Sequence, residues 1–399
     1  MRIVTLLLVL LLTGCTSLRE PDAPRFPHRE QTISLPLQWL YTGDMGGLPL
    51  VNIRLGEAEQ PRNTWWLVDT GSSHNVVSPQ LVEELKLPQQ SSSNFLTVAG
   101  QRSAPYVTLP PLQLGALTLE GQSASAVDMS KLGVAQGLPV EGILGLPAMR
   151  HLAVTIDYPA RTLTLTRQAR PAAYNLPHTW LPFRIESGVP VARLETAPGR
   201  FGDFILDTGN AATLVMFPNH GRQFGQLANA NYRFIEVADL GGSVLTGLSM
   251  LPSLRMGQLE IRHIPVYSPA SNKGFGHLAG TIGNALFIGK SVTWDFPGQQ
   301  LLISMAGADT SLPGSFGFLL GLDNAIQTVI PDSPAAQAGF QPGDRILAID
   351  GVDMQKGGSH AIWRHLHHRN VAGFTLSRRE QTLRILLERR YFLPLLSSS

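Results

Sequence analysis

This chain contains Trp65-Trp66-Leu67-Val68-Asp69-Thr70-Gly71-Ser72, an apolar run that ends in Asp-Thr-Gly. The same pattern returns in Phe204-Ile205-Leu206-Asp207-Thr208-Gly209-Asn210. From average residue usage, a given tripeptide of this kind is expected about once in several thousand positions. Two copies in 399 residues, each after a strand-like apolar stretch, therefore indicate a relation between two parts of the chain.

Further residues repeat in register with these two triplets. Gly145, in Gly142-Ile143-Leu144-Gly145-Leu146, lies 76 residues after Asp69, and Gly283, in Gly280-Thr281-Ile282-Gly283-Asn284, lies 76 residues after Asp207. Asp157 and Asp295 close two predicted strands and lie 88 residues after the same two aspartates. A match that holds its register over this length indicates an internal duplication, in which each half contributes one carboxylate.

The duplicated pattern resembles the aspartic proteases, which have two β-rich lobes with one Asp-Thr-Gly loop in each and the site at their junction. The resemblance covers roughly residues 45–305. It includes Ile143-Leu144-Gly145 and Thr281-Ile282-Gly283, which match the segments that pass behind the catalytic loops in that family. It implies a mainly β, bilobal fold of pepsin-like or fused retropepsin-type β-barrel lobes, at 34–170 and 171–305. Two ordinary Asp-containing turns capped by Gly are the alternative.

The resemblance assigns catalysis to Asp69 and Asp207. Two carboxylates held about 3 Å apart cannot both ionise, so they share one proton. The ionised oxygen takes a proton from a water that attacks the peptide carbonyl, and the protonated partner donates to the developing oxyanion. This chemistry requires no metal and no other cofactor. Which aspartate is protonated stays open, because the pair titrates as a unit.

The resemblance also gives roles to the neighbours of the two aspartates. It implies that Thr70 and Thr208 reach across to the backbone of the opposite loop, and that Ser72 hydrogen-bonds the outer oxygen of Asp69. Gly71 and Gly209 allow the backbone to come close beside each carboxylate. Asn210 stands at the place equivalent to Ser72, where the family usually has Ser, Thr or Ala, and this departure leaves the pH optimum open.

The N-terminus predicts export and lipidation. Residues 1–14 combine a short basic start with an apolar core, which is typical of a signal peptide and too short to span a bilayer. Leu12-Thr13-Gly14-Cys15 resembles a bacterial lipobox, which implies a lipid on Cys15, the only cysteine. Thr16 stands where Asp would indicate inner-membrane retention, so we expect anchoring in the bacterial outer membrane, facing the periplasm. The proline-rich residues 15–33 are predicted to be an exposed tether.

The C-terminal part resembles a bacterial PDZ domain, which we expect at residues 312–392. The resemblance rests on a short helix, a Pro-Gly-Asp turn and a strand within 333–351. Ser315-Phe316-Gly317-Phe318 matches the family's carboxylate-binding loop, with Ser in place of the first Gly. Its N–H groups would hold the C-terminus of a peptide. A PDZ fold that only packs on the protease and binds nothing is the alternative.

Four histidines lie in the helix expected at 359–368, but they lack a His partner at i, i+4 and an interleaved carboxylate. The pattern therefore predicts a solvated helix and no metal site. A net charge of +2 gives no reason to expect nucleic-acid binding. Because one chain supplies both lobes, the catalytic unit is expected to be a monomer that acts on proteins or peptides. The alternative function is a non-catalytic scaffold or binding lipoprotein with a degenerate protease fold.

Overall fold

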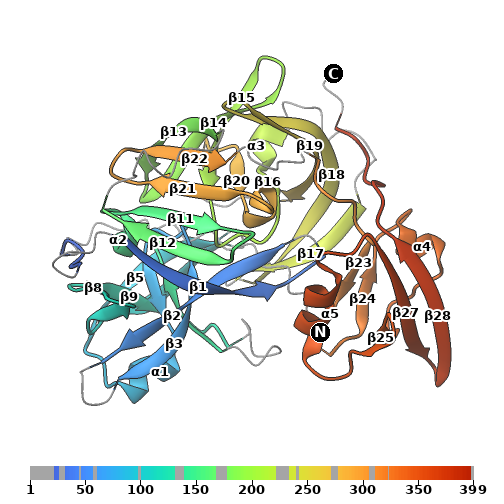
Figure 1. Cartoon of the computed structure of the whole chain (residues 1–399), viewed down its shortest axis with the longest axis horizontal. Helices are drawn as coiled ribbons and strands as arrows, with labels where there is room; N and C mark the ends of the chain where they lie inside the picture. Colours follow the sequence, from blue (N-terminus) through green and yellow to red (C-terminus); the bar gives the residue numbers. More distant parts are fainter. Residues whose placement is uncertain are drawn as a thin grey trace.

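The protein is described from a computed structural model. The described residues are 22–26, 32–44, 46–56, 61–97, 100–130, 139–167, 178–221, 233–239, 242–270, 277–304, 311–321 and 323–396. Figure 1 shows two β-rich lobes stacked on one another, with a smaller domain beside them that carries the last strands. The fold is mainly β, which confirms the predicted fold class.

Strands dominate all three parts. The N-terminal lobe contains β1 (Thr32–Tyr41), β2 (Gly47–Leu55), β3 (Arg62–Val68), β4 (Asn75–Val77), α1 (Pro79–Glu84), β5 (Gln89–Thr97), β6 (Gly100–Thr108), β7 (Leu112–Leu114), β8 (Leu117–Leu119), β9 (Ser123–Ala126), β10 (Val140–Leu144), α2 (Leu146–Met149), β11 (Ala153–Asp157) and β12 (Thr162–Thr166). The C-terminal lobe contains β13 (His178–Glu186), β14 (Val189–Ala197), β15 (Arg200–Leu206), β16 (Leu214–Met216), α3 (Pro218–Gly221), β17 (Arg233–Asp239), β18 (Gly242–Met256), β19 (Leu259–Pro269), β20 (Gly280–Ile282), the 3-10 helix η4 (Asn284–Phe287), β21 (Ser291–Asp295) and β22 (Gln300–Ser304). The last domain contains β23 (Phe318–Leu320), β24 (Ile326–Val329), α4 (Pro334–Gln337), β25 (Arg345–Ile349), β26 (Val352–Asp353), α5 (Gly358–Leu366), β27 (Val371–Arg378) and β28 (Gln381–Glu388).

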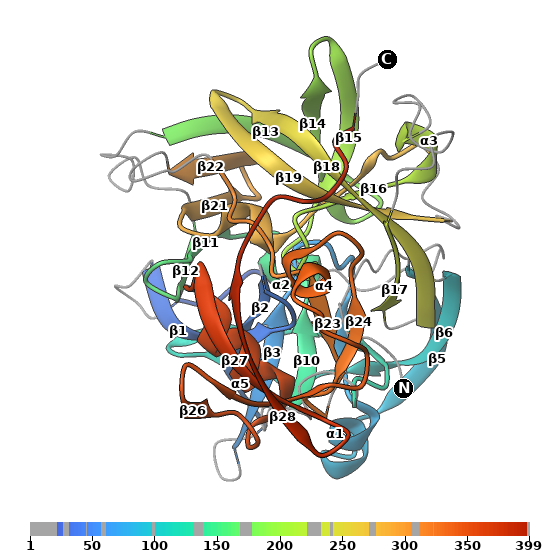
Figure 2. The ribbon, with the colours of Figure 1, turned by 90° about the vertical axis from the view of Figure 1, so that its right-hand side faces the viewer.

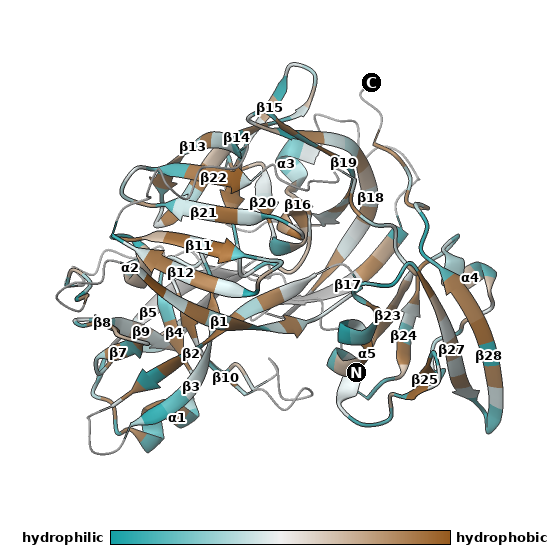
Figure 3. Ribbon diagram, viewed as in Figure 1, coloured by the Kyte–Doolittle hydropathy of each residue, from teal (hydrophilic) through white to brown (hydrophobic). Residues whose placement is uncertain are grey.

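A sheet shared by both lobes joins them. Its strands pair antiparallel in the order β1, β12, β11, β21, β22 and β13. Thr155 lies opposite Thr293 at its centre, and their hydroxyls hydrogen-bond at 2.7 Å. These threonines are 138 residues apart, the same separation as Asp69 and Asp207, so a pseudo-twofold axis relates the lobes. Figure 3 shows hydrophobic residues gathered along these stacked strands.

The two apolar-apolar-Gly segments pass behind the Asp-Thr-Gly loops, as the resemblance implies. β10 lies parallel to β3 and antiparallel to β4, while β20 lies parallel to β15 and antiparallel to β16. The Asp69 N–H donates to the Leu144 carbonyl at 3.0 Å, and the Asp207 N–H donates to the Ile282 carbonyl at 2.8 Å. Each aspartate is therefore fixed to the segment behind it at the point where its strand ends.

Buried aromatic side chains fill the lobes beneath these loops. Trp66, Phe204, Phe287 and Trp294 are each fully buried. Burial of a large apolar side chain contributes roughly 1.5–3 kcal/mol, so these residues stabilise the strands that carry the aspartates. One hairpin, β5–β6, forms in the N-terminal lobe, and another, β17–β18, forms in the C-terminal lobe.

The C-terminal domain has a small aromatic core. The ring of Phe318, in β23, stacks on Trp363 of α5 with centroids 5.2 Å apart, and Phe374 of β27 packs edge-on against Phe316. The expectation that α5 is a solvated helix is wrong for its inner face, because His360 is only 7% exposed. That face packs against the end of β1, which removes it from solvent.

The segment after β28 returns to the C-terminal lobe. The Met250 N–H donates to the Pro394 carbonyl and the Leu396 N–H donates to the Met250 carbonyl, both at 2.8 Å. Figure 2 shows this dark red segment running from the PDZ-like domain to β18. The last domain is thus attached to the protease-like lobes at both of its ends.

The described part of residues 15–33 is not the exposed tether that the sequence predicts, because it pairs with the N-terminal lobe. The Arg25 N–H donates to the Thr118 carbonyl at 2.9 Å, and the Thr118 N–H donates back at 3.1 Å. Arg25 lies between prolines, which lack an N–H group, but it has both an N–H and a carbonyl group of its own. It can therefore pair with the edge strand β8. Cys15 and the predicted signal peptide lie outside the described residues. Within the described part of the chain, no helix is long and apolar enough to cross a membrane.

Candidate active site

Asp69 and Asp207 follow the ends of β3 and β15, and both are fully buried. Each lies against the glycine of the opposite loop. A Cβ added to Gly71 would lie 2.4 Å from Cγ of Asp207, and one added to Gly209 would lie 2.3 Å from Cγ of Asp69. Any side chain at either glycine would therefore displace the opposite carboxyl, which explains why both triplets end in Gly.

Each carboxyl group has one oxygen fixed by its own loop. The Gly71 N–H donates to Oδ1 of Asp69 and the Gly209 N–H donates to Oδ1 of Asp207, both at 2.9 Å. The Oδ2 atoms are also buried, and neither has a hydrogen-bond partner among the described groups. This geometry leaves one oxygen of each carboxyl group free to exchange protons.

Burial raises the pKa of both aspartates, because a charged carboxylate is costly away from water. The charge of Asp69 raises the pKa of Asp207 further. Backbone N–H groups of Gly71, Ser72 and Gly209 oppose this rise at Asp69. Two adjacent acids with raised pKa values can hold one proton between them, which is the state that general acid–base chemistry needs.

Two threonines lock the loops together by a reciprocal exchange. Thr70 Oγ1 donates to the Leu206 carbonyl at 2.7 Å and accepts from the Thr208 N–H at 3.1 Å. Thr208 Oγ1 donates to the Val68 carbonyl at 2.7 Å and accepts from the Thr70 N–H at 2.9 Å. Both hydroxyls thus reach the opposite backbone, as the resemblance implies.

Ser72 differs from the arrangement that the resemblance implies. Its hydroxyl donates to the His74 carbonyl at 2.7 Å and not to Asp69. A hydroxyl has a single proton, and the Asp69 carboxylate already receives backbone N–H groups, so the nearby carbonyl takes that proton. Ser72 therefore supports the shape of the first loop and contacts Asp69 through its backbone.

Asn210 braces the second loop in place of a hydroxyl residue. Its Nδ2 donates to Thr281 Oγ1 at 2.8 Å, and its Oδ1 accepts from the Ala212 N–H at 2.8 Å. Asn284, which sequence reasoning missed, donates from Nδ2 to the Thr208 carbonyl and accepts from the Tyr158 hydroxyl at 2.5 Å. The equivalent position in the first repeat is Leu146, so the duplication gave no indication that Asn284 belongs to the site.

The predicted PDZ loop, Ser315 to Phe318, lies away from the aspartate pair. Phe316 and Phe318 point into the domain core and are buried, while Ser315 Oγ and the Phe316 N–H donate to Asp44. Among the described residues, no group of three or more His, Cys, Asp or Glu side chains is placed to hold a metal ion.

Comparisons with known proteins match both parts of the chain. A family model described as aspartyl protease matches residues 51–148, and one described as PDZ domain matches residues 326–362. The putative serine protease HhoA of Synechocystis sp. is 27% identical over 186 residues, 43% of this chain and 47% of that protein. Human PDZ domain-containing protein 11 is 42% identical over 59 residues, 15% of this chain and 36% of that protein. The matches span about half or less of the length of these relatives.

Two solved structures resemble this chain at low identity. The aspartic proteinase from Irpex lacteus is 14% identical, with a TM-score of 0.42, and the match covers 70% of this chain and 99% of that chain. Conglutin gamma from lupine seeds is 12% identical, with a TM-score of 0.43, and covers 69% and 95%. Residues 51–148 are therefore similar in sequence to aspartyl protease domains, and residues 326–362 are similar to PDZ domains.

Proposed function

We propose that this protein is an aspartic endopeptidase in which Asp69 and Asp207 act as one acid–base pair. The observation that carries the proposal is the reciprocal approach of each carboxyl group to the glycine of the opposite loop. The buried Oδ2 atoms and the raised pKa values support it, because they favour one shared proton over two charges.

In this proposal, the ionised carboxylate takes a proton from water as the water oxygen attacks the peptide carbonyl carbon. The protonated carboxyl group donates its proton to the carbonyl oxygen, giving a neutral tetrahedral diol. When the diol collapses, the C–N bond breaks, the nitrogen receives the proton that the first carboxylate took from water, and the other carboxylate takes a proton from a diol hydroxyl, which restores the shared proton of the pair. The N–H groups of Asp69's neighbours favour charge on Asp69, so Asp207 is the proposed acid in the first step.

The test replaces each aspartate by asparagine. Asp69→Asn and Asp207→Asn should each lower kcat/KM for a peptide-library substrate by at least about a thousandfold, and the double variant should lose little more, because the two groups work as a unit. Asp157→Asn and Asp295→Asn are matched controls, since these aspartates repeat at equivalent places but cap turns. If the wild type and both single variants cleave no faster than background, the non-catalytic scaffold is favoured, whereas clear wild-type turnover that both variants keep would contradict the aspartic mechanism.

A serine peptidase is the second candidate, because HhoA carries that description and Ser73 Oγ lies 3.0 Å from His74 Nδ1. Burial lowers the pKa of His74 to about 4, which makes it a weak base. Ser73→Ala separates the two candidates. The aspartic mechanism predicts that this variant keeps its turnover, whereas a serine mechanism predicts that it loses it.

The proposal extends to location and partners. We propose that a lipid on Cys15 anchors the protein to the bacterial outer membrane, facing the periplasm, and that the PDZ domain docks protein or peptide substrates. The catalytic unit is proposed to be a monomer, because both aspartates come from one chain. The apolar end of the predicted signal and the Leu-Thr-Gly-Cys motif support the anchor.

A further inference from the structure

The loop predicted to bind a carboxylate holds one that belongs to this chain. Ser315 Oγ donates to Oδ2 of Asp44 at 2.7 Å, and the Phe316 N–H donates to the same oxygen at 3.0 Å. The Gly317 N–H donates to Ser315 Oγ at 3.0 Å, so the hydroxyl proton is directed toward Asp44. Asp44 lies in the turn between β1 and β2, 271 residues before Ser315.

A buried arginine completes the site. Arg389, whose side chain is 2% exposed, places Nη1 3.8 Å from Oδ2 of Asp44, and its Nη2 donates to the Asp44 carbonyl at 2.7 Å. Its guanidinium also lies over the Phe316 ring, 4.7 Å from the centroid. A buried cation without an anion is strongly unfavourable, so this site requires a negative charge next to Arg389.

The chain before Asp44 contacts the opposite wall of the same domain. The Tyr41 N–H, at the end of β1, donates to Nδ1 of His360 in α5 at 3.1 Å. The Tyr41 ring lies 4.8 Å from the His367 ring, centroid to centroid. The segment from Tyr41 to Asp44 therefore touches both the carboxylate loop and the helix α5.

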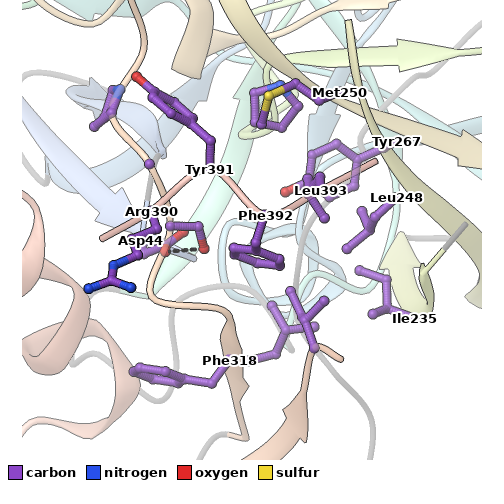
Figure 4. A pocket seen from close by; sticks show the side chains of 16 residues that line it. Asp44, Ile235, Leu248, Met250, Tyr267, Phe318, Arg390, Tyr391, Phe392 and Leu393 are labelled. Carbon is purple, nitrogen blue, oxygen red and sulfur yellow. Dashed lines mark hydrogen bonds between the residues drawn. The ribbon is translucent and has the colours of Figure 1, made fainter. Parts of the chain in front are cut away.

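We propose that Asp44 is an intramolecular ligand of the PDZ domain, and that a peptide with a free C-terminal carboxylate binds by displacing it. Both carboxylates require the same Ser315 and Phe316 donors, and one arginine cannot neutralise two. Figure 4 shows Asp44 beside Arg390, near the cavity that Phe392 and Ile235 also line. Because Asp44 belongs to the same chain and is held beside the loop by the folded lobe, it competes as an intramolecular ligand, at a higher effective concentration than a dilute free peptide.

Displacement of Asp44 should loosen the loop that carries Asp207. A Cβ added to Gly46 would lie 2.0 Å from the Ala211 carbonyl oxygen, so only glycine permits this contact. Gly46 lies two residues after Asp44, and Ala211 lies two residues after Gly209. Peptide binding should therefore increase amide hydrogen exchange in residues 209–213. An effect of peptide binding on turnover rests on the proposed peptidase function, whereas the replacement of Asp44 by a peptide carboxylate does not.

The experiment uses the full chain with Asp69→Asn, so that bound peptides are not cut. It compares this parent with versions that also carry Asp44→Asn or Asp128→Asn. Asp128 is a matched control, because its exposed carboxylate caps a turn in the same lobe by accepting from the Ser130 N–H. The probe is a pool of random octapeptides with free C-terminal carboxylates, beside the same pool with amidated ends, and retained peptides are quantified by mass spectrometry.

Asp44→Asn should retain at least about tenfold more of the free-carboxylate pool than the parent, because the tethered competitor is weakened. Asp128→Asn should match the parent, and the amidated pool should not be retained. Equal retention by parent and Asp44→Asn, equal retention of the amidated pool, or no retention at all would overturn the proposal. If melting shows that Asp44→Asn does not fold, the test uses the Asp69→Asn parent alone. Binding of the free-carboxylate pool must then raise amide hydrogen exchange at residues 42–44 and 209–213. Unchanged exchange at these residues rejects displacement.

Discussion

Asp69 and Asp207 occupy equivalent places but receive different numbers of backbone donors. Three N–H groups favour the charged form of Asp69, whereas Asp207 has two such groups and faces the charge of Asp69. The surroundings therefore favour the proton on Asp207. The extra donor at Asp69 is the Gly209 N–H of the opposite loop, whereas the two donors at Asp207, Gly209 and Asn210, both belong to its own loop.

The raised pKa values of the pair predict a pH dependence of stability. Because the folded state binds protons more tightly, stability is highest below the unfolded-state pKa of about 4 and falls as pH rises through the folded-state values. Asp207→Asn should remove much of this fall and be more stable than the wild type by about 1 kcal/mol or more at pH 7, since one pKa unit corresponds to about 1.4 kcal/mol. Urea unfolding between pH 4 and 8 measures it, with Asp157→Asn as control. Equal slopes in all three proteins would contradict the prediction.

The Ser72 hydroxyl should matter for stability and not for the titration of the pair. Ser72→Ala leaves the His74 carbonyl without its hydroxyl donor, which costs about 1–3 kcal/mol if nothing replaces it. The pH profile of kcat/KM should keep its midpoints, because the hydroxyl does not contact Asp69. A shift in the acidic limb, with stability unchanged, would instead place that hydroxyl on the carboxylate.

The loops after β3 and β15 are held together as a pair of elements. Thr70→Val should lower both stability, by about 1–3 kcal/mol, and kcat, because it removes two hydrogen bonds that align the loops. Thr155→Val is the matched control, since its hydroxyl also pairs across the pseudo-twofold axis but lies in the sheet that joins the lobes. Equilibrium unfolding measures the effect on stability, and steady-state kinetics measure the effect on kcat. A kcat loss of the same size in Thr155→Val would attribute the effect to general stability.

Docking of the PDZ domain affects the whole molecule through the C-terminal lobe. Removal of the chain after residue 305 would uncover Ile235 and Leu248, which are 4% and 3% exposed, and would leave Met250 without its partner at Pro394. The shortened protein should melt roughly 2–4 °C lower, because roughly 1–2 kcal/mol of apolar packing is lost. Its turnover of a short peptide at 15 °C should remain within about threefold, since the hydrogen bonds to the aspartate pair among the described residues come from earlier positions. Thermal melts and peptide kinetics at that temperature measure both effects, and an unchanged melting temperature would show that docking contributes no stability.

The predicted lipid anchor is tested in the producing bacterium. Cys15→Ser should move the protein from the membrane fraction to the soluble periplasmic fraction, because stable anchoring by this route requires several acyl chains on that one residue. Blotting of separated fractions measures this, with Thr16→Ser as control. Retention of Cys15→Ser in the membrane would contradict the lipid anchor.

The duplication could be predicted from the sequence because the residues that specify it act locally. Strands that must be buried are apolar, and a loop whose backbone meets the opposite carboxyl needs Gly at Gly71 and Gly209. The equal 76-residue spacing to Gly145 and Gly283 follows from the crossing of β10 and β20 behind the loops. Residue type and spacing therefore predicted a duplication with one aspartate in each half, and the resemblance to aspartic proteases implied the two lobes and the threonine exchange.

Only the tertiary structure decided which partner each polar side chain takes. Ser72 bonds to His74, Asn284 bonds to the Thr208 carbonyl, and Asp44 reaches Ser315 across 271 residues. Such choices depend on which acceptor the fold brings within about 3 Å, and competing hydrogen bonds differ by only about 1 kcal/mol. No periodicity or spacing in the chain predicts these distances, because they are set by the shape of the first loop for Ser72, by packing within the C-terminal lobe for Asn284, and by the contact between two domains for Asp44.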